Sequence, residues 1–141
     1  MGPRASFRRF AGIVTTVTAA GLLLCGCGAS ATRLNGARDA AARFEHALAA
    51  RDYPAACRLL APETREQVEE DEAKECAQAL AGQDLSVGGT VRRTEVYGRQ
   101  AMVRAGGQVL FLSQFAPGWR VVAAGCTPDG DRPYRCLVKG G

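Results

Sequence analysis

The hydrophobic pattern of this chain changes its period once, at Gly82. Upstream of Gly82, apolar residues recur at the spacing of one face of a helix. Downstream, apolar and polar residues alternate in short runs that end at glycine or proline, as they do in strands. Helices followed by strands predict an α+β fold, in which N-terminal helices pack on one face of a curved antiparallel sheet.

Three helices are predicted before Gly82. The first has an apolar stripe made of Ala37, Ala40, Ala41, Phe44, Ala47 and Leu48. The second follows Asp52, a favoured N-cap residue, and has Pro54 in its first turn. The third is expected to run from Pro62 to Gly82. Its acidic stretch, 63–75, is typical of a solvated helix face and lacks the spacing of a calcium loop.

The strand region opens at Leu85 and Val87. Strands are then expected over residues 91–97, 101–105, 108–115, 119–124 and 134–138. Gly106-Gly107 and Pro117-Gly118 are turn signals between them, which favours an antiparallel meander. The segment TPDGDRP, residues 127–133, is expected to be a turn-rich loop.

Residues 1–24 have the layout of a secretory signal. Three arginines and no acid precede an apolar run over 13–24. This run is shorter than the ~20 residues of a permanent membrane helix. The pair Arg8-Arg9 raises the twin-arginine export route, but its flanking residues match that motif poorly, so the general secretory route is favoured.

The apolar run ends in Leu24-Cys25-Gly26-Cys27, which resembles the lipobox of bacterial lipoproteins. The resemblance implies that residues 1–26 are a signal peptide and that Cys27 becomes a lipidated N-terminus, followed by a tether over 27–36. It implies a location on the outer face of the cytoplasmic membrane, with the lipid as anchor. The alternative is a plain secretory cleavage that leaves Cys27 as a free thiol.

Removing residues 1–26 from the 141-residue chain leaves 115 residues, enough for one domain with its own core, expected over 37–141. The full chain carries a formal charge of +4, and the segment removed takes three arginines with it, which leaves a net charge of +1. No basic stripe with interleaved aromatic residues remains, so a nucleic-acid partner is not expected.

Four cysteines remain in the expected domain besides Cys27. An even number in an exported domain indicates disulfides. Three pairings exist, and Cys57–Cys76 with Cys126–Cys136 is favoured because each bond closes a local loop. A zinc site is the rival interpretation, but the spacings are not those of a CxxC motif and His46 is the only histidine.

The expected domain resembles the NTF2-like family of cone-shaped α+β domains. The resemblance rests on the element order, on a helix with Phe44 and Leu48 that leads into residues 51–57 (RDYPAAC), and on 117–121 (PGWRV) at the start of a late strand. The cystatin-like grouping shares the broad shape. The resemblance implies a pocket between helices and sheet, and it raises a homodimer formed through the sheets.

Residues that could line such a pocket are Tyr53, Glu95, Tyr97 and Trp119. A proton-transfer site would need a carboxylate in an apolar cavity, for which Glu95 and Glu45 are the candidates. No catalytic triad, phosphate loop or metal motif can be assembled, and no cofactor is expected.

Two classes of function remain. The first is a non-catalytic domain that binds an envelope protein or a small ligand, and the second is a small isomerase or cyclase that uses a buried carboxylate. A pocket filled by Phe111, Phe115 and Trp119 would favour the first, and an acid that faces the pocket would favour the second.

Overall fold

The computed structural model describes Gly2, residues 29–87 and residues 89–140. The predicted signal peptide and the lipidated Cys27 lie outside the described residues. None of the described helices combines the length and the apolar character needed to cross a bilayer.

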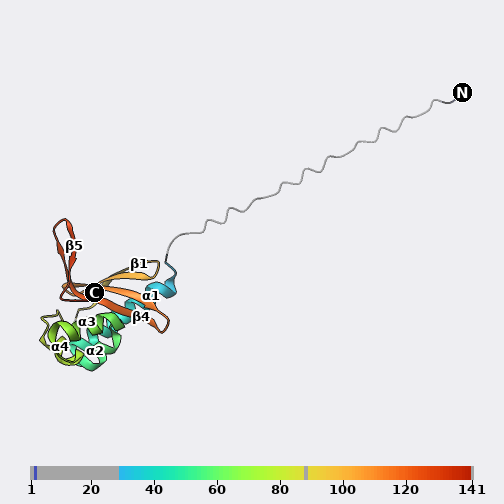
Figure 1. The fold of residues 1–141 in the computed structure, drawn as a ribbon. Helices are drawn as coiled ribbons and strands as arrows, with labels where there is room; N and C mark the ends of the chain where they lie inside the picture. Colours follow the sequence, from blue (N-terminus) through green and yellow to red (C-terminus); the bar gives the residue numbers. More distant parts are fainter. Residues whose placement is uncertain (1, 3–28, 88, 141) are drawn as a thin grey trace.

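Four helices precede the sheet (Figure 1). They are α1 (Ala31–Ala49), α2 (Tyr53–Leu59), α3 (Pro62–Glu72) and α4 (Cys76–Gly82). Ser30 caps α1 by accepting a hydrogen bond from the Arg33 amide. The helix therefore begins within the segment expected to be a tether, and residues 31–36 are helical.

The single helix predicted from Pro62 to Gly82 is wrong, because the chain breaks it after Glu72. Ala73 adopts a left-handed conformation with φ of 50°. The Glu69 carboxylate then accepts hydrogen bonds from the Arg65 guanidinium and, at 3.2 Å, from the Cys76 amide at the start of α4. The Arg65 hydrogen bond is the main cause that lowers the pKa of Glu69. A side chain of α3 thus satisfies a free amide of α4 and fixes the turn between them.

The strands form an antiparallel sheet with the order β1-β2-β3-β4-β5, and β6 also pairs with β4. They are β1 (Val91–Tyr97), β2 (Gln100–Ala105), β3 (Gln108–Phe115), β4 (Gly118–Asp129), β5 (Arg132–Arg135) and β6 (Val138–Lys139). The α+β class and the antiparallel meander predicted from the sequence are confirmed.

Helix α1 lies along one face of the sheet (Figure 1). Its predicted apolar stripe is buried there, and Phe44 and Leu48 meet the inward side chains of β2, β3 and β4. The largest fully buried side chains of this core are Phe44, Leu48, Leu80, Val103, Leu110, Leu112, Val121 and Val138. Helix α2 packs against α1, α4 packs against α2, and α3 packs against α4 and strands β4 and β6, so these three helices cluster at one end of the sheet (Figure 1).

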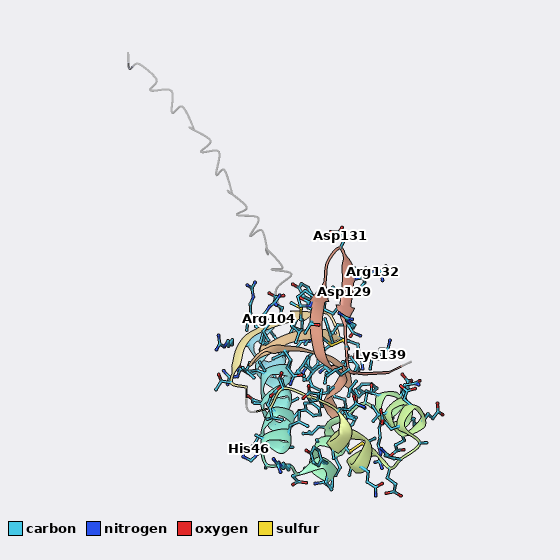
Figure 2. All side chains as sticks on the ribbon, turned by 90° about the vertical axis from the view of Figure 1, so that its left-hand side faces the viewer. His46, Arg104, Asp129, Asp131, Arg132 and Lys139 are labelled. Carbon is cyan, nitrogen blue, oxygen red and sulfur yellow. A yellow bond between two sulfur atoms is a disulfide. The ribbon has the colours of Figure 1, made fainter. Side chains whose placement is uncertain are left out.

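The turn-rich loop expected over 127–133 is instead a hairpin. Strand β4 continues to Asp129 and returns as β5, and Figures 1 and 2 both show this β4–β5 hairpin projecting beyond the sheet, with Asp131 at its tip. At its base, Tyr134 packs edge-on against Phe111 with ring centroids 5.2 Å apart. A small second core, Val109, Ala123 and Cys126, lies on this outer face of the sheet.

Both favoured disulfides are present. Cys57–Cys76 joins α2 to α4, and Cys126–Cys136 closes the base of the β4–β5 hairpin. Because all four sulfurs are in disulfides, the rival four-thiolate zinc site is excluded.

Candidate functional site

The four residues predicted to line a pocket do not converge on one. Trp119 is 7% exposed and packs in the main core, where its ring lies against Gly36 of α1. Tyr53 is half-buried at the edge of the same core. Glu95 forms an ion pair with Arg93 and accepts a hydrogen bond from the Tyr97 hydroxyl on the same strand. Tyr97 itself is 66% exposed.

The space between α1 and the sheet is filled by side chains. Phe44, Leu110 and Leu112 have no exposed surface at all, so they occupy the region in which the family resemblance implies a pocket. Phe111 lies on the opposite face of the sheet, and Phe115 lines a surface hollow. Of the three aromatic residues expected to fill the pocket, only Trp119 does so.

Glu45, the second candidate acid, belongs to α1 and is buried between this helix and the first residue of β3, Gln108. Its exposed fraction is 3%. Its Oε1 accepts a hydrogen bond of 2.7 Å from Gln108 Nε2, and its Oε2 accepts one of 3.3 Å from the Gly89 amide. Burial raises the pKa of Glu45 to about 6, although these two hydrogen bonds oppose the shift.

Gln108 extends this network to two more segments. Its Nε2 also donates to the Ser86 carbonyl at 2.8 Å, and its Oε1 accepts from the Gly125 amide at 2.6 Å. The Glu45–Gln108 pair therefore holds α1, the segment before β1 and the middle of β4 together. Every polar atom of Gln108 is used in this way, which is how a buried amide avoids a desolvation cost.

Glu45 also borders a shallow hollow of about 500 Å³, which is lined by Arg38, Asp39, Ala42, Glu45, His46, Ala49 and residues 89–91. Both carboxylate oxygens already accept hydrogen bonds from the protein. The arrangement therefore supports a structural role for Glu45 between α1 and the sheet.

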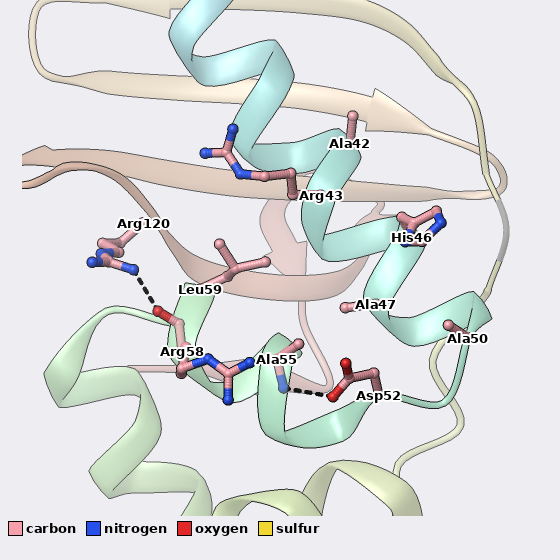
Figure 3. A pocket seen from close by; sticks show the side chains of 10 residues that line it. All are labelled: Ala42, Arg43, His46, Ala47, Ala50, Asp52, Ala55, Arg58, Leu59 and Arg120. Carbon is pink, nitrogen blue, oxygen red and sulfur yellow. Dashed lines mark hydrogen bonds between the residues drawn. The ribbon is translucent and has the colours of Figure 1, made fainter.

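A second hollow lies between α1 and α2, and we call it the α1–α2 groove (Figure 3). Its volume is about 530 Å³. It is lined by Ala42, Arg43, His46, Ala47, Ala50, Asp52, Ala55, Arg58, Leu59 and Arg120. Except for Leu59, the apolar residues that line the groove are alanines, and their small side chains leave room between the two helices.

The charges of the α1–α2 groove come from three different elements. Arg43 belongs to α1, Arg58 to α2 and Arg120 to β4. Among the residues that the structure describes, none of these three guanidinium groups forms an ion pair. Asp52 supplies the one carboxylate, and it caps α2 by accepting a hydrogen bond of 3.0 Å from the Ala55 amide.

Arg120 is held in place at the edge of the groove. Its Nη1 donates to the main-chain carbonyl of Arg58, which ties β4 to α2 (Figure 3). Both arginines also line a neighbouring hollow of about 840 Å³, the Phe115 hollow, whose apolar walls include Leu60, Phe115 and Pro117. The two hollows thus share a basic wall.

No pattern in the sequence indicates the α1–α2 groove. Arg43, Arg58 and Arg120 are far apart in the sequence. Only Arg120 lies in a segment singled out from the sequence, 117–121, and that segment was interpreted as the start of a strand and not as part of a binding site. The one local signal was Asp52, which was predicted as the N-cap of α2 and is confirmed in that role.

Comparison with known proteins does not assign a family. No protein-family model matches the chain, and searches of curated proteins and of solved structures give no match. Within the part of the chain that the structure describes, no three histidine, cysteine, aspartate or glutamate side chains gather as a metal site requires.

Proposed function

We propose that this protein is an exported, lipid-anchored binding protein whose single domain holds a small ligand without transforming it. The observation that carries the proposal is the α1–α2 groove, an open hollow with an apolar floor and three guanidinium groups that form no ion pair with any described residue. Ligand sites are typically concave and largely apolar, with a few convergent polar groups that fix orientation.

Export and anchoring are supported by the N-terminal sequence and by the cysteines. The lipobox-like segment Leu24–Cys27 ends an apolar run behind three arginines. The disulfides Cys57–Cys76 and Cys126–Cys136 are what an oxidising compartment outside the cytoplasm produces. We propose that Cys27 carries the lipid and that the domain stands on the outer face of the cytoplasmic membrane.

We further propose that the domain is an NTF2-like cone. The support is that all of the helices described precede the strands, that α1 lies along one face of the sheet and that the sheet is an antiparallel meander. The filled interior is a departure from the pocket that the resemblance implies, and it moves the binding site to the surface between α1 and α2.

An isomerase or cyclase is the second candidate, and Glu45 is the observation that favours it. Its pKa of about 6 suits a general acid or base near neutral pH. Binding is the better-supported function because Gln108 and Gly89 occupy both oxygens of Glu45.

Native mass spectrometry of the protein, extracted in mild detergent from its own membranes, tests the proposal. We expect a mass that begins at Cys27, carries a diacylglyceryl group, lacks the hydrogens of four thiols and includes a retained small molecule. An unlipidated mass would contradict the anchor. A lipidated protein that releases no small molecule on denaturation would contradict ligand binding.

A further inference from the structure

We propose that the α1–α2 groove recognises an oxyanion, a phosphate or carboxylate group carried on an apolar body, through Arg43, Arg58 and Arg120. This inference rests on the proposed binding function and names the chemical class of its ligand. It assigns the anion to the three guanidinium groups and the apolar body to the floor around Leu59.

The net positive charge of the groove favours binding of an anion. The three guanidinium groups and the one carboxylate that line it have a net charge of +2. Like charges that share one hollow repel each other, and this repulsion is relieved when an anion enters. Asp52 offsets one of the three positive charges and leaves the other two, and its Oδ1 is already engaged by the Ala55 amide.

Because the cations of the groove are guanidinium groups, they favour particular classes of anion. A guanidinium presents a planar fork of N–H donors that matches two oxygens of a phosphate or a carboxylate. Arg43, Arg58 and Arg120 belong to three elements around Leu59, and Figure 3 shows their side chains extending in different directions along the rim of the groove, so each offers its donors to an oxyanion from a different side of the hollow. Arg120 is half-buried and already oriented by the Arg58 carbonyl, which reduces the entropy lost when it binds.

The apolar floor of the groove is the reason to expect an apolar part in the ligand. Leu59, Ala47, Ala50 and Ala55 line it, and they offer no hydrogen-bonding side chains. A hollow of about 530 Å³ falls within the common range for small-molecule sites, ~300–1,000 Å³. A free inorganic anion would leave this floor uncovered, so a ligand with both parts fits better.

The test is an NMR titration of the full chain, oxidised so that both disulfides are formed, with four phenyl compounds. Phenyl phosphate and phenylacetate carry an oxyanion, benzyl alcohol is neutral and benzylamine is cationic. We expect amide shifts in α1 and α2 with both anions and none with the other two. The phosphate should bind more tightly than the carboxylate, because at pH 7.5 it carries about two negative charges against the +2 of the groove.

Two matched variants test the arginines. Arg43→Gln removes an exposed guanidinium from the groove, and Arg132→Gln removes one from β5 in the β4–β5 hairpin (Figure 2), so each lowers the net charge equally. We expect Arg43→Gln to weaken phenyl phosphate binding about tenfold, the scale of a charge-assisted hydrogen bond, and Arg132→Gln to leave the affinity unchanged.

Three results would overturn the inference. The first is equal binding of benzyl alcohol and phenyl phosphate in the groove, which would leave the proposed binding function intact but remove the anion. The second is an equal loss of affinity in Arg43→Gln and Arg132→Gln, which would indicate non-specific charge attraction. The third is a set of shifts confined to the Phe115 hollow, which would move the site to the far side of Arg58 and Arg120.

Discussion

Glu45 shows how a single buried carboxyl shapes the stability of the protein. Its side chain joins α1 to Gln108 and Gly89, and burial raises its pKa from 4.5 to about 6. The folded state therefore holds the proton of Glu45 more tightly than the unfolded chain does. The contribution of this group to stability is complete below pH 4.5 and is lost as the pH rises through about 6.

This shift predicts a pH dependence that the Glu45→Gln variant should lack. A shift of this size corresponds to about 2 kcal/mol, so the wild type should lose about that much free energy of unfolding between pH 4.5 and pH 7, relative to Glu45→Gln. Urea unfolding of both proteins across this pH range measures the difference. A difference that does not change with pH would contradict the buried state of Glu45.

The close approach of Gly89 to the main chain of Gly106 predicts that a side chain at position 89 destabilises the fold. A Cβ atom on Gly89 would stand 2.4 Å from the Gly106 main-chain nitrogen, and backbone cannot move aside as a flexible side chain can. We expect Gly89→Ala to lower the free energy of unfolding by about 1–3 kcal/mol, the scale of overpacking.

Gly82→Ala is the matched control for Gly89→Ala. A Cβ at Gly82, the last residue of α4, would meet nothing within 4 Å, so this variant should be as stable as the wild type or slightly more so. Chemical denaturation compares the two. Equal stability of the two variants would show that the approach of Gly89 to Gly106 is not tight.

At the scale of elements, removal of each of the two disulfides should have a different consequence for stability. Each closes a short loop, of 19 and 10 residues, so the chain-entropy contribution is about 3 kcal/mol for both. Their surroundings differ, because Cys57 and Cys76 lie in the main core between α2 and α4, whereas Cys126–Cys136 lies in the small outer core.

Replacing Cys57 and Cys76 by alanine should therefore lower the stability of the whole domain by about 3 kcal/mol. Replacing Cys126 and Cys136 should act mainly on the β4–β5 hairpin, where hydrogen exchange of residues 126–136 should accelerate while α1 stays protected. Hydrogen exchange with mass spectrometry measures both variants. Faster exchange throughout the domain after loss of Cys126–Cys136 would contradict this division.

The break between α3 and α4 could not be predicted from local sequence. Ala73 takes a left-handed conformation that normally favours glycine or asparagine, and neither residue is present there. The causes lie elsewhere in the fold, in the Glu69 contact with the Cys76 amide and in the bond from Cys76 to Cys57. Helix periodicity continues through this stretch, so it suggested a single helix.

For the whole molecule, the proposed anchor predicts a contrast between two cysteines of the lipobox-like segment. Cys27→Ala should abolish lipid attachment and release the protein from the membrane fraction, since Cys27 is the acceptor that the resemblance implies. Cys25→Ala should leave attachment unchanged, because the proposed cleavage before Cys27 would remove Cys25. Cell fractionation and intact mass measure both, and loss of attachment in Cys25→Ala would move the cleavage site.

The sequence by itself determined the class of the fold, the helix α1 with its buried stripe, the meander of strands and both disulfides. The helices and strands depend on periodicity, caps and turn residues within a few positions of each other, and the disulfides close loops of only 19 and 10 residues, so a linear pattern contains them. The sequence misplaced two boundaries. Helix α1 begins at Ala31, where Gly36 lies against Trp119, and strands β4 and β5 pair through residues that were expected to form a loop, next to the contact of Tyr134 with Phe111.

Only the tertiary structure decided which polar side chains come together in the candidate site and in the buried network of Glu45. Glu45 and Gln108 are 63 residues apart, and Arg120 reaches the carbonyl of Arg58 across 62 residues. A pattern of neighbours cannot contain such pairs, because they form when α1 and α2 pack against the sheet. The same packing fills the interior with Phe44 and Leu110 and leaves the arginines around an open groove.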